Sequence, residues 1–207
     1  MNNTITVNLD NLTESERAMV LSLAKKEKNT KPVNLPGVKD GETFKIGDIE
    51  FIKFPGENGM TPVVTKDILF TSRFGNNNDL RASDILKKLQ AEILPKITAA
   101  IGAENLCTIK TDLTTLDGLK PYEDLESLIS LPTFDFYRAN VSIFDKHKVD
   151  KWWWLATPES AYPHSDPYWI LCVSPSGWFD CNCYFIDYGG VRPFCIFKSS
   201  IFESSEE

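Results

Sequence analysis

Residues 168–186 read YWILCVSPSGWFDCNCYFI and predict a β-hairpin. The runs 168–174 and 178–186 have strand length and are rich in apolar side chains. Between them, Pro175-Ser176-Gly177 is typical of a turn. We therefore expect an antiparallel sheet near the C-terminus.

The second run of this hairpin alternates in character, so its side chains divide between two faces of a strand. Phe179, Cys181, Cys183 and Phe185 predict a core face, because free cysteine buries well. The opposite face predicts a ligand-contact patch, since Trp, Tyr and Asn combine large contact area with hydrogen bonding. The alternative is an ordinary half-exposed strand whose aromatic residues pack under a loop. The candidate ligand-binding residues are Trp169, Ser176, Trp178, Asp180, Asn182, Tyr184, Asp187 and Tyr188.

The segment after the hairpin predicts a turn at 187–190 and a third strand over 191–197. Pro193 limits the pairing of that strand, because it has no N–H to donate. We expect Arg192 to anchor the sheet through a buried carboxylate pair. Ahead of the hairpin, Trp152-Trp153-Trp154 could stack on sugars or bases. We favour a core role, since consecutive strand residues point to opposite faces.

Strands and helices are also predicted earlier in the chain. The runs 43–46 and 49–54 around Gly47-Asp48 predict a hairpin, and 63–70 predicts a strand region. Residues 106–130 look irregular, with one short strand at 106–109. Ser83 is a candidate N-cap for a helix that Pro95 should kink or end and Gly102 should stop. Residues 133–137 predict a short helix.

The N-terminal part reads as a separate appendage. Residues 5–9 predict a strand, and residues 14–27 predict a helix that starts with the capping box Thr13 to Glu16. The segment 28–41 contains two Pro and two Gly, which favours a linker. The expected organisation is a strand–helix appendage (1–30), a linker (31–41), a main domain (42–202) and an acidic tail (203–207).

Composition narrows the function classes. The chain has 207 residues, a net charge of −7 and no apolar run of membrane-spanning length. A general DNA binder would carry a basic face, so we expect no direct nucleic-acid binding and no membrane partner. No secretory signal is visible, so we expect a cytoplasmic or phage-particle location and five reduced cysteines.

Motifs for chemistry are weak, and we expect no catalytic residues, no metal and no cofactor. Cys181-x-Cys183 lacks zinc-ribbon spacing, and neither His147 nor His164 stands at ligand spacing from a cysteine. His164 is flanked by Ser165 and Asp166, but triad members meet through the fold rather than in one loop, so we expect a solvated loop. The acidic segment 122–126 predicts a solvated face or, alternatively, contact with a basic partner.

Several segments resemble an uncharacterised domain family of bacteria and their prophages. The first is WWLATP at 153–158 with the preceding Trp152, the second is VSPSG at 173–177, and the third is GVRPFCIF at 190–197. Weaker matches are 47–52, 79–81 and 131–137. Together they span about residues 40–202.

That family is similar to C-type-lectin-like folds, which include formylglycine-generating enzymes and the variable proteins of diversity-generating retroelements. The resemblance implies an α+β fold with small antiparallel sheets, two helices and long loops. It also implies a ligand surface on the last strands. Calcium-dependent sugar binding is not expected, because Trp178-Phe179-Asp180 lacks the asparagine of the lectin triplet.

Three functions follow as hypotheses. The first is a non-enzymatic protein-binding module of bacterial or prophage origin, in which the N-terminal segment is a candidate site of homo-oligomerisation. The alternative is a phage-encoded intracellular inhibitor of a host defence enzyme such as a CRISPR nuclease, because an acidic surface suits a basic groove. The third is a metal-assisted oxidase, which rests on fold analogy alone.

Overall fold

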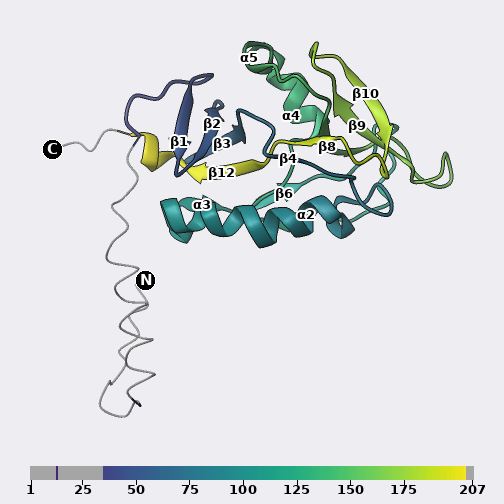
Figure 1. Ribbon diagram of the computed structural model, residues 1–207, viewed down its shortest axis with the longest axis horizontal. Coiled ribbons are helices and arrows are strands. Elements are labelled where there is room, and N and C mark those ends of the chain that lie inside the picture. The colour runs from purple at the N-terminus through teal and green to yellow at the C-terminus, as the bar shows by residue number, and fades with distance from the viewer. Residues whose placement is uncertain (1–12, 14–34, 204–207) are drawn as a thin grey trace. The chain divides into compact units, whose positions relative to one another are not determined.

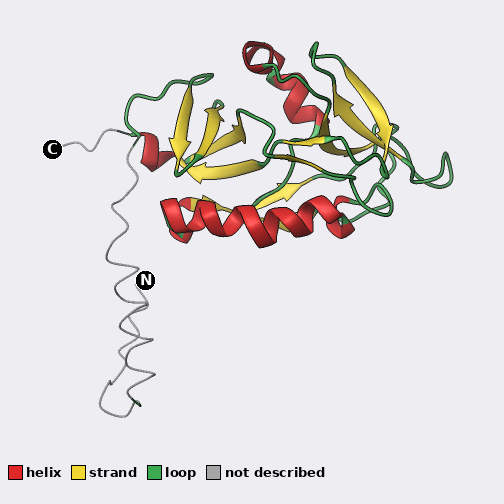
Figure 2. Cartoon of the chain, viewed as in Figure 1, coloured by secondary structure: helices red, strands yellow, loops and turns green. Residues whose placement is uncertain are grey.

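The computed structural model describes Thr13 and residues 35–203. The chain divides into two units, Met1–Val33 and Asn34–Glu207, and the elements below belong to the second. The strand and helix expected at 5–9 and 14–27 lie outside the described residues, as does most of the acidic tail. The described part is α+β, with antiparallel sheets and helices beside them (Figures 1 and 2), as the sequence predicted.

One five-stranded sheet forms the half of this unit that contains the first strands. Its β1–β2 hairpin pairs Phe44 with Phe51, which confirms the hairpin predicted around Gly47. The rings of Phe44 and Phe51 stack with centroids 5.8 Å apart, and Phe197 packs edge-on against both. In sheet order the strands are β1 (Thr43–Ile46), β2 (Ile49–Lys53), β3 (Met60–Thr65), β12 (Phe194–Lys198) and β5 (Leu106–Cys107).

A second five-stranded sheet contains the hairpin predicted at 168–186, which is confirmed. Strands β9 and β10 pair antiparallel, and Gly177 takes a φ of +90° in the turn between them, where a residue with a Cβ would be strained. Among the described strands, β10 has only β9 as a neighbour and is therefore an edge strand. In sheet order the strands are β10 (Phe179–Cys183), β9 (Trp169–Val173), β8 (Trp153–Pro158), β11 (Gly190–Val191) and β4 (Phe70–Thr71).

The prediction of one continuous strand over 191–197 is wrong, because two separate strands occupy this stretch. Gly190–Val191 belongs to the second sheet, whereas Phe194–Lys198 belongs to the first. The chain crosses from one sheet to the other at Arg192 and Pro193. Pro193 has no N–H for a ladder, but its carbonyl accepts a hydrogen bond from Thr65 N at 3.0 Å. The proline thus marks a crossing between the sheets.

A long helical segment lies along one side of both sheets (Figure 1). It consists of α2 (Asp84–Lys88), the π-helical η3 (Leu89–Ile93) and α3 (Leu94–Ile101). Ser83 caps it, as predicted: its Oγ accepts a hydrogen bond from Leu86 N at 2.9 Å. The helix stops at Gly102, also as predicted, where φ is +84°.

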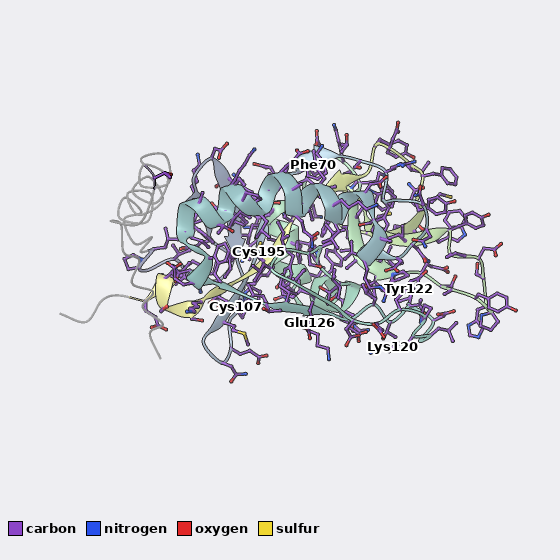
Figure 3. All side chains as sticks on the ribbon, turned by 90° about the horizontal axis from the view of Figure 1, so that it is seen from below. Phe70, Cys107, Lys120, Tyr122, Glu126 and Cys195 are labelled. Carbon is purple, nitrogen blue, oxygen red and sulfur yellow. The ribbon has the colours of Figure 1, made fainter. Side chains whose placement is uncertain are left out.

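Pro95 does not end this helix, although one alternative predicted that it would, but it follows a local distortion of the helix. The helix continues past Pro95 to Ile101, but the turn just before it is widened, and Leu94 N donates to the carbonyl of Leu89. A widened turn accommodates a residue that has no N–H of its own. Lys88 Nζ lies 4.2 Å from the ring centre of Phe70, which joins this helix to β4. Figure 3 labels Phe70.

The remaining elements are short. Thr133 caps the helix predicted at 133–137, since its Oγ1 accepts from Phe136 N at 3.1 Å. The single strand expected at 106–109 is instead two strands, and the second of them pairs with a strand from the region expected to be irregular. The short elements whose bounds have not yet been given are β6 (Ile109–Thr111), β7 (Leu125–Ser127), α4 (Phe134–Ala139), α5 (Val141–Phe144), η2 (Leu80–Ala82), η4 (Ala103–Asn105), η5 (Asp145–His147) and η6 (Ser199–Phe202).

The tryptophan run lies in the core, as predicted. Trp153 and Trp154 are buried and point to opposite faces of β8, whereas Trp152 is half-buried. Trp153 packs against Tyr137 and Phe144 from α4 and α5. Trp154 donates from Nε1 to the carbonyl of Ser72 at 2.9 Å. In the part of the chain that the structure describes, no helix has the length and apolar character to cross a membrane.

Candidate binding surface

The predicted contact strand β10 lies at the sheet edge, and this changes the expected division of its faces. Phe179 and Phe185 are exposed and Cys183 is half-buried, whereas Cys181 packs against the main core cluster, so the predicted Phe/Cys core face is confirmed only at Cys181. An edge strand has fewer side chains around each of its faces, because no further strand lies beyond it. Phe179 keeps one aromatic contact, with Phe134 of α4 at 4.7 Å between ring centroids.

The strand register separates Trp169 from the other candidate residues. In the β9–β10 ladder Trp169 is directly opposite Cys183, and Ile170 is opposite Asn182. Directly opposed residues project to the same side of a sheet. Trp169 therefore shares the face of Cys181 and Cys183, and the expectation that it extends the Asp180–Asn182 face is wrong.

The side chains of Asp180 and Asn182 bond to their own strand. Asp180 Oδ1 accepts a hydrogen bond from the N–H of Cys181 at 2.8 Å, and Asn182 Oδ1 accepts one from the N–H of Cys183 at 2.9 Å. Along an edge strand, successive N–H groups point alternately toward the neighbouring strand and away from it. The N–H of Tyr184 points toward the β9 side, because it donates to the carbonyl of Tyr168 at 2.9 Å. The N–H groups of Cys181 and Cys183 therefore face the open edge, and the side chains of Asp180 and Asn182 cover these donors, with which another strand could otherwise pair.

The hairpin turn holds the base of Trp178 in place. Ser174 Oγ lies 2.8 Å from Ser176 Oγ and accepts a hydrogen bond from Trp178 N at 3.1 Å. The indole beyond this anchor is 72% exposed. Ser176 thus supports the turn, whereas Trp178 offers the largest contact area of the predicted residues.

The other end of β10 carries three of the predicted residues. Tyr184 is half-buried and stacks on Tyr168 at 5.7 Å between centroids, with the rings 10° from parallel. Asp187 and Tyr188, in the next turn, are exposed. Tyr184 therefore acts in packing, while Asp187 and Tyr188 are free to contact a partner.

Exposed aromatic side chains are concentrated on β9, β10 and their flanking loops. Among the described residues, every large aromatic side chain classed as exposed falls between positions 162 and 188. We call this set the aromatic edge: Tyr162, Tyr168, Trp169, Trp178, Phe179, Phe185 and Tyr188.

The same part of the sequence is acidic and lacks basic residues other than one histidine. From residue 152 to residue 191 there is no Lys and no Arg, but there are four carboxylates: Glu159, Asp166, Asp180 and Asp187. Asp166, Asp180 and Asp187 are exposed, and Glu159 is half-buried. Asp180 adjoins Phe179 and Asp187 adjoins Tyr188 in sequence. The aromatic edge therefore combines apolar contact area with negative charge.

His164 lies in an exposed loop, as the sequence predicted, but it also makes one long-range contact. Its Nδ1 lies 2.8 Å from Oδ2 of Asp117, 47 residues earlier in the chain. The Thr115 hydroxyl and, more weakly, His164 hold the pKa of Asp117 below its usual range. No local motif could have predicted this contact, because the two residues meet only through the fold.

The His164–Asp117 pair borders a hollow of about 350 Å³ on the Trp169 face. Ser160, Ser165 and Cys181 also line this hollow. Burial raises the pKa of the Cys181 thiol, which keeps it protonated and poorly nucleophilic at neutral pH. The hollow therefore presents hydrogen-bonding groups beside an exposed indole, without an activated cysteine.

Asn78 is a buried positioning residue that the sequence analysis missed. Its Nδ2 donates to the carbonyls of Ser160 and Trp169 at 2.8 and 3.1 Å. Its backbone N–H donates to Pro167, and its Oδ1 accepts from the Tyr122 hydroxyl at 2.6 Å. Asn78 thus ties the 159–169 loop to β9 and to the 112–124 loop, where Figure 3 labels Lys120 and Tyr122. Its position in a polar loop gave no sign of burial.

The structure also tests the predictions for the acidic segment 122–126 and for Arg192. The acidic segment 122–126 is a solvated face at Glu123 and Glu126, as predicted, whereas Asp124 lies 3.2 Å from Lys110 and 3.0 Å from Lys120. The predicted carboxylate partner of Arg192 is wrong: its Nε donates instead to the carbonyl of Thr65 at 3.0 Å. Within Thr13 and residues 35–203, no three His, Cys, Asp or Glu side chains are grouped as a metal site would require.

Comparisons of the chain with protein-family models, with curated proteins and with solved structures find no match. The aromatic edge therefore has to be interpreted from its own geometry and chemistry.

Proposed function

We propose that this chain is a non-enzymatic protein-binding module that uses the aromatic edge to contact a basic segment of its partner. The observation that carries the proposal is the concentration of exposed aromatic side chains in a stretch without Lys or Arg. Large exposed apolar groups cost solubility unless a partner covers them.

The composition of the edge favours a protein ligand. Trp and Tyr are the residue types that contribute most to binding energy at protein interfaces. Basic side chains of a partner could lie over the Trp178 and Tyr188 rings and pair with Asp180 or Asp187. Since Asp180 and Asn182 already cover the edge N–H groups, we propose recognition through side chains rather than by addition of a β-strand.

The C-type-lectin-like assignment and the bacterial or prophage origin belong to the same proposal. Two mostly antiparallel five-stranded sheets, a long helical segment beside them and extended loops near the C-terminal strands support the fold assignment. A ligand surface on the last strands is the arrangement that the family resemblance implies. An experimental structure superposed on C-type-lectin-like domains tests the fold assignment: a different strand connectivity would reject it.

Inhibition of a host defence enzyme, such as a CRISPR nuclease, is the second candidate. It is favoured by the same charge pattern, because a sequence stretch with four carboxylates and no Lys or Arg suits a basic nucleic-acid groove. The two candidates differ in the partner that is captured and in whether the complex loses nuclease activity.

The test is affinity capture from bacterial lysate with the full chain and with Trp178→Ala/Tyr188→Ala. We expect one stoichiometric partner that the double variant loses while its circular dichroism is unchanged. Met60→Ala is the matched control, since Met60 is an exposed apolar residue on the other sheet. Retention of the partner by the double variant, or its loss from the Met60 variant, would reject the proposed surface.

A further inference from the structure

Arg192 is a buried cation without a carboxylate partner. Arg192 is 1% exposed, and its Nε donates to the carbonyl of Thr65 at 3.0 Å. Within residues 35–203, its Nη2 has no hydrogen-bond partner. Among the residues that the structure describes, no Asp or Glu oxygen lies within 4.0 Å of this guanidinium. An arginine keeps its charge in proteins, so the charge has to be compensated in another way.

Aromatic rings compensate part of that charge. The guanidinium carbon lies 4.9 Å from the ring centre of Trp153 and 5.6 Å from that of Phe144. Cation–π contacts of this kind are stabilising, but they give Nη2 no acceptor. Burial lowers the pKa of Arg192 to about 10, and the more distant charge of Asp67 opposes this shift only in part. A buried cation with an unbonded N–H group is costly to keep.

A small cavity adjoins the same side chain. It measures about 10 Å³ and is lined by Arg192, Lys148, Tyr137 and Ser174 among others. The Lys148 ammonium lies 3.3 Å from Asp145 and is half-exposed, and the Lys148 side chain also lines the cavity. A cavity of this size is near the lower limit for one water molecule, and a halide ion, which is slightly larger than water, requires a small outward shift of the lining side chains. Phosphate, sulfate or a partner's carboxylate is too large for it.

We propose that this cavity is a binding site for a monatomic halide, chloride in the cell, held against Nη2 of Arg192. The anion supplies the acceptor that Nη2 lacks and a negative charge at the guanidinium itself, whereas the nearby Asp145 carboxylate is paired with Lys148. Lys148 adds a second positive charge on the same cavity. The site is separate from the aromatic edge, and its test does not depend on the proposed protein partner.

The first test is thermal unfolding in sodium chloride and in sodium gluconate at equal ionic strength. A ligand that binds only the folded chain raises Tm as its concentration exceeds its Kd. We expect Tm to rise with chloride and with bromide, and to stay flat in gluconate. Lys148→Ala should weaken the chloride dependence. Lys146→Ala should preserve it, because Lys146 is an exposed neighbour that does not line the cavity.

Arg192→Met and a bromide soak make the test decisive. The methionine fills similar space without charge, so the variant should show the same Tm in both salts. A crystal soaked in bromide should give an anomalous peak beside Nη2 of Arg192. If Arg192→Met does not fold, the Lys148 series and the bromide soak still decide the outcome. Equal Tm values for the native chain in the two salts, or a water molecule without bromide in the cavity, would overturn the proposal.

Discussion

The carboxamide nitrogen of Asn78 lies 3.1 Å from the carbonyl oxygen of Trp169, although 91 residues separate them in sequence. Through this bond and the one to Ser160, the buried amide fixes the start of β9 and the loop before it. Trp169 and the neighbouring aromatic residues belong to the proposed binding surface. The surface therefore depends on a polar residue that is not itself part of it.

Asn78→Ala should lower the free energy of unfolding by about 2–4 kcal/mol, because two buried carbonyls and the Tyr122 hydroxyl lose their partner. Urea denaturation followed by tryptophan fluorescence measures the change. Asn140→Ala is the control, since Asn140 donates a single side-chain bond, to Phe136, and should cost about 1 kcal/mol. Equal costs for the two variants would remove the special role of Asn78.

Ser83→Ala should destabilise the chain by about 1 kcal/mol, the usual cost of losing an N-cap. The bond from Leu86 N to Ser83 Oγ satisfies a donor in the first turn of the long helix. Chemical denaturation provides the measurement. Ser142→Ala, at an exposed position in α5, should change little; a cost at Ser142 as large as that at Ser83 would contradict the capping account.

Alkylation should distinguish the five cysteines. Burial raises the pKa of Cys172 to about 12 and raises that of Cys195 further, so both thiols remain protonated and inaccessible in the folded chain. With iodoacetamide at mildly alkaline pH, mass spectrometry should find these two unlabelled until denaturant is added. Rapid labelling of either one in the folded state would contradict the described core.

Stability should fall in acid. Hydrogen bonds from Thr115 and His164 lower the folded-state pKa of Asp117, and hydrogen bonds from Thr114 lower that of Asp112. A carboxyl with a lowered folded-state pKa adds stability above its unfolded pKa of about 3.9, and that stability is lost as the pH falls through the folded pKa. Unfolding free energy should therefore decrease below about pH 4. Asp117→Asn should flatten this decrease, and an unchanged pH profile in that variant would remove Asp117 from the explanation.

The sequence predicted the local elements more reliably than their long-range placement. The β9–β10 hairpin, the Ser83 cap and the stop at Gly102 were predicted because turn and capping residues act on their immediate neighbours. The position of β10 at a sheet edge was not predictable, because alternation reveals the two faces of a strand but not what covers them. The same limit explains the error at Arg192, whose surroundings come from distant segments.

The candidate site was predicted in part for the same reason. The exposure of Trp178 and Tyr188 agrees with the predicted patch. Trp169 lies on the side of the sheet opposite to Asp180 and Asn182, because the strand register pairs it with Cys183. The sequence alone does not specify this register. Asn78 and the Asp117–His164 contact join residues far apart in the chain, so only the folded arrangement could reveal them.

The most direct test of the central claim is photo-crosslinking in bacterial cells that express the chain, with benzoylphenylalanine in place of Trp178 or, as the control, Met60. Both positions are exposed, but only the first belongs to the aromatic edge. The account predicts that position 178 crosslinks to one protein and that position 60 does not. No crosslink at position 178, or the same products from both positions, would contradict it.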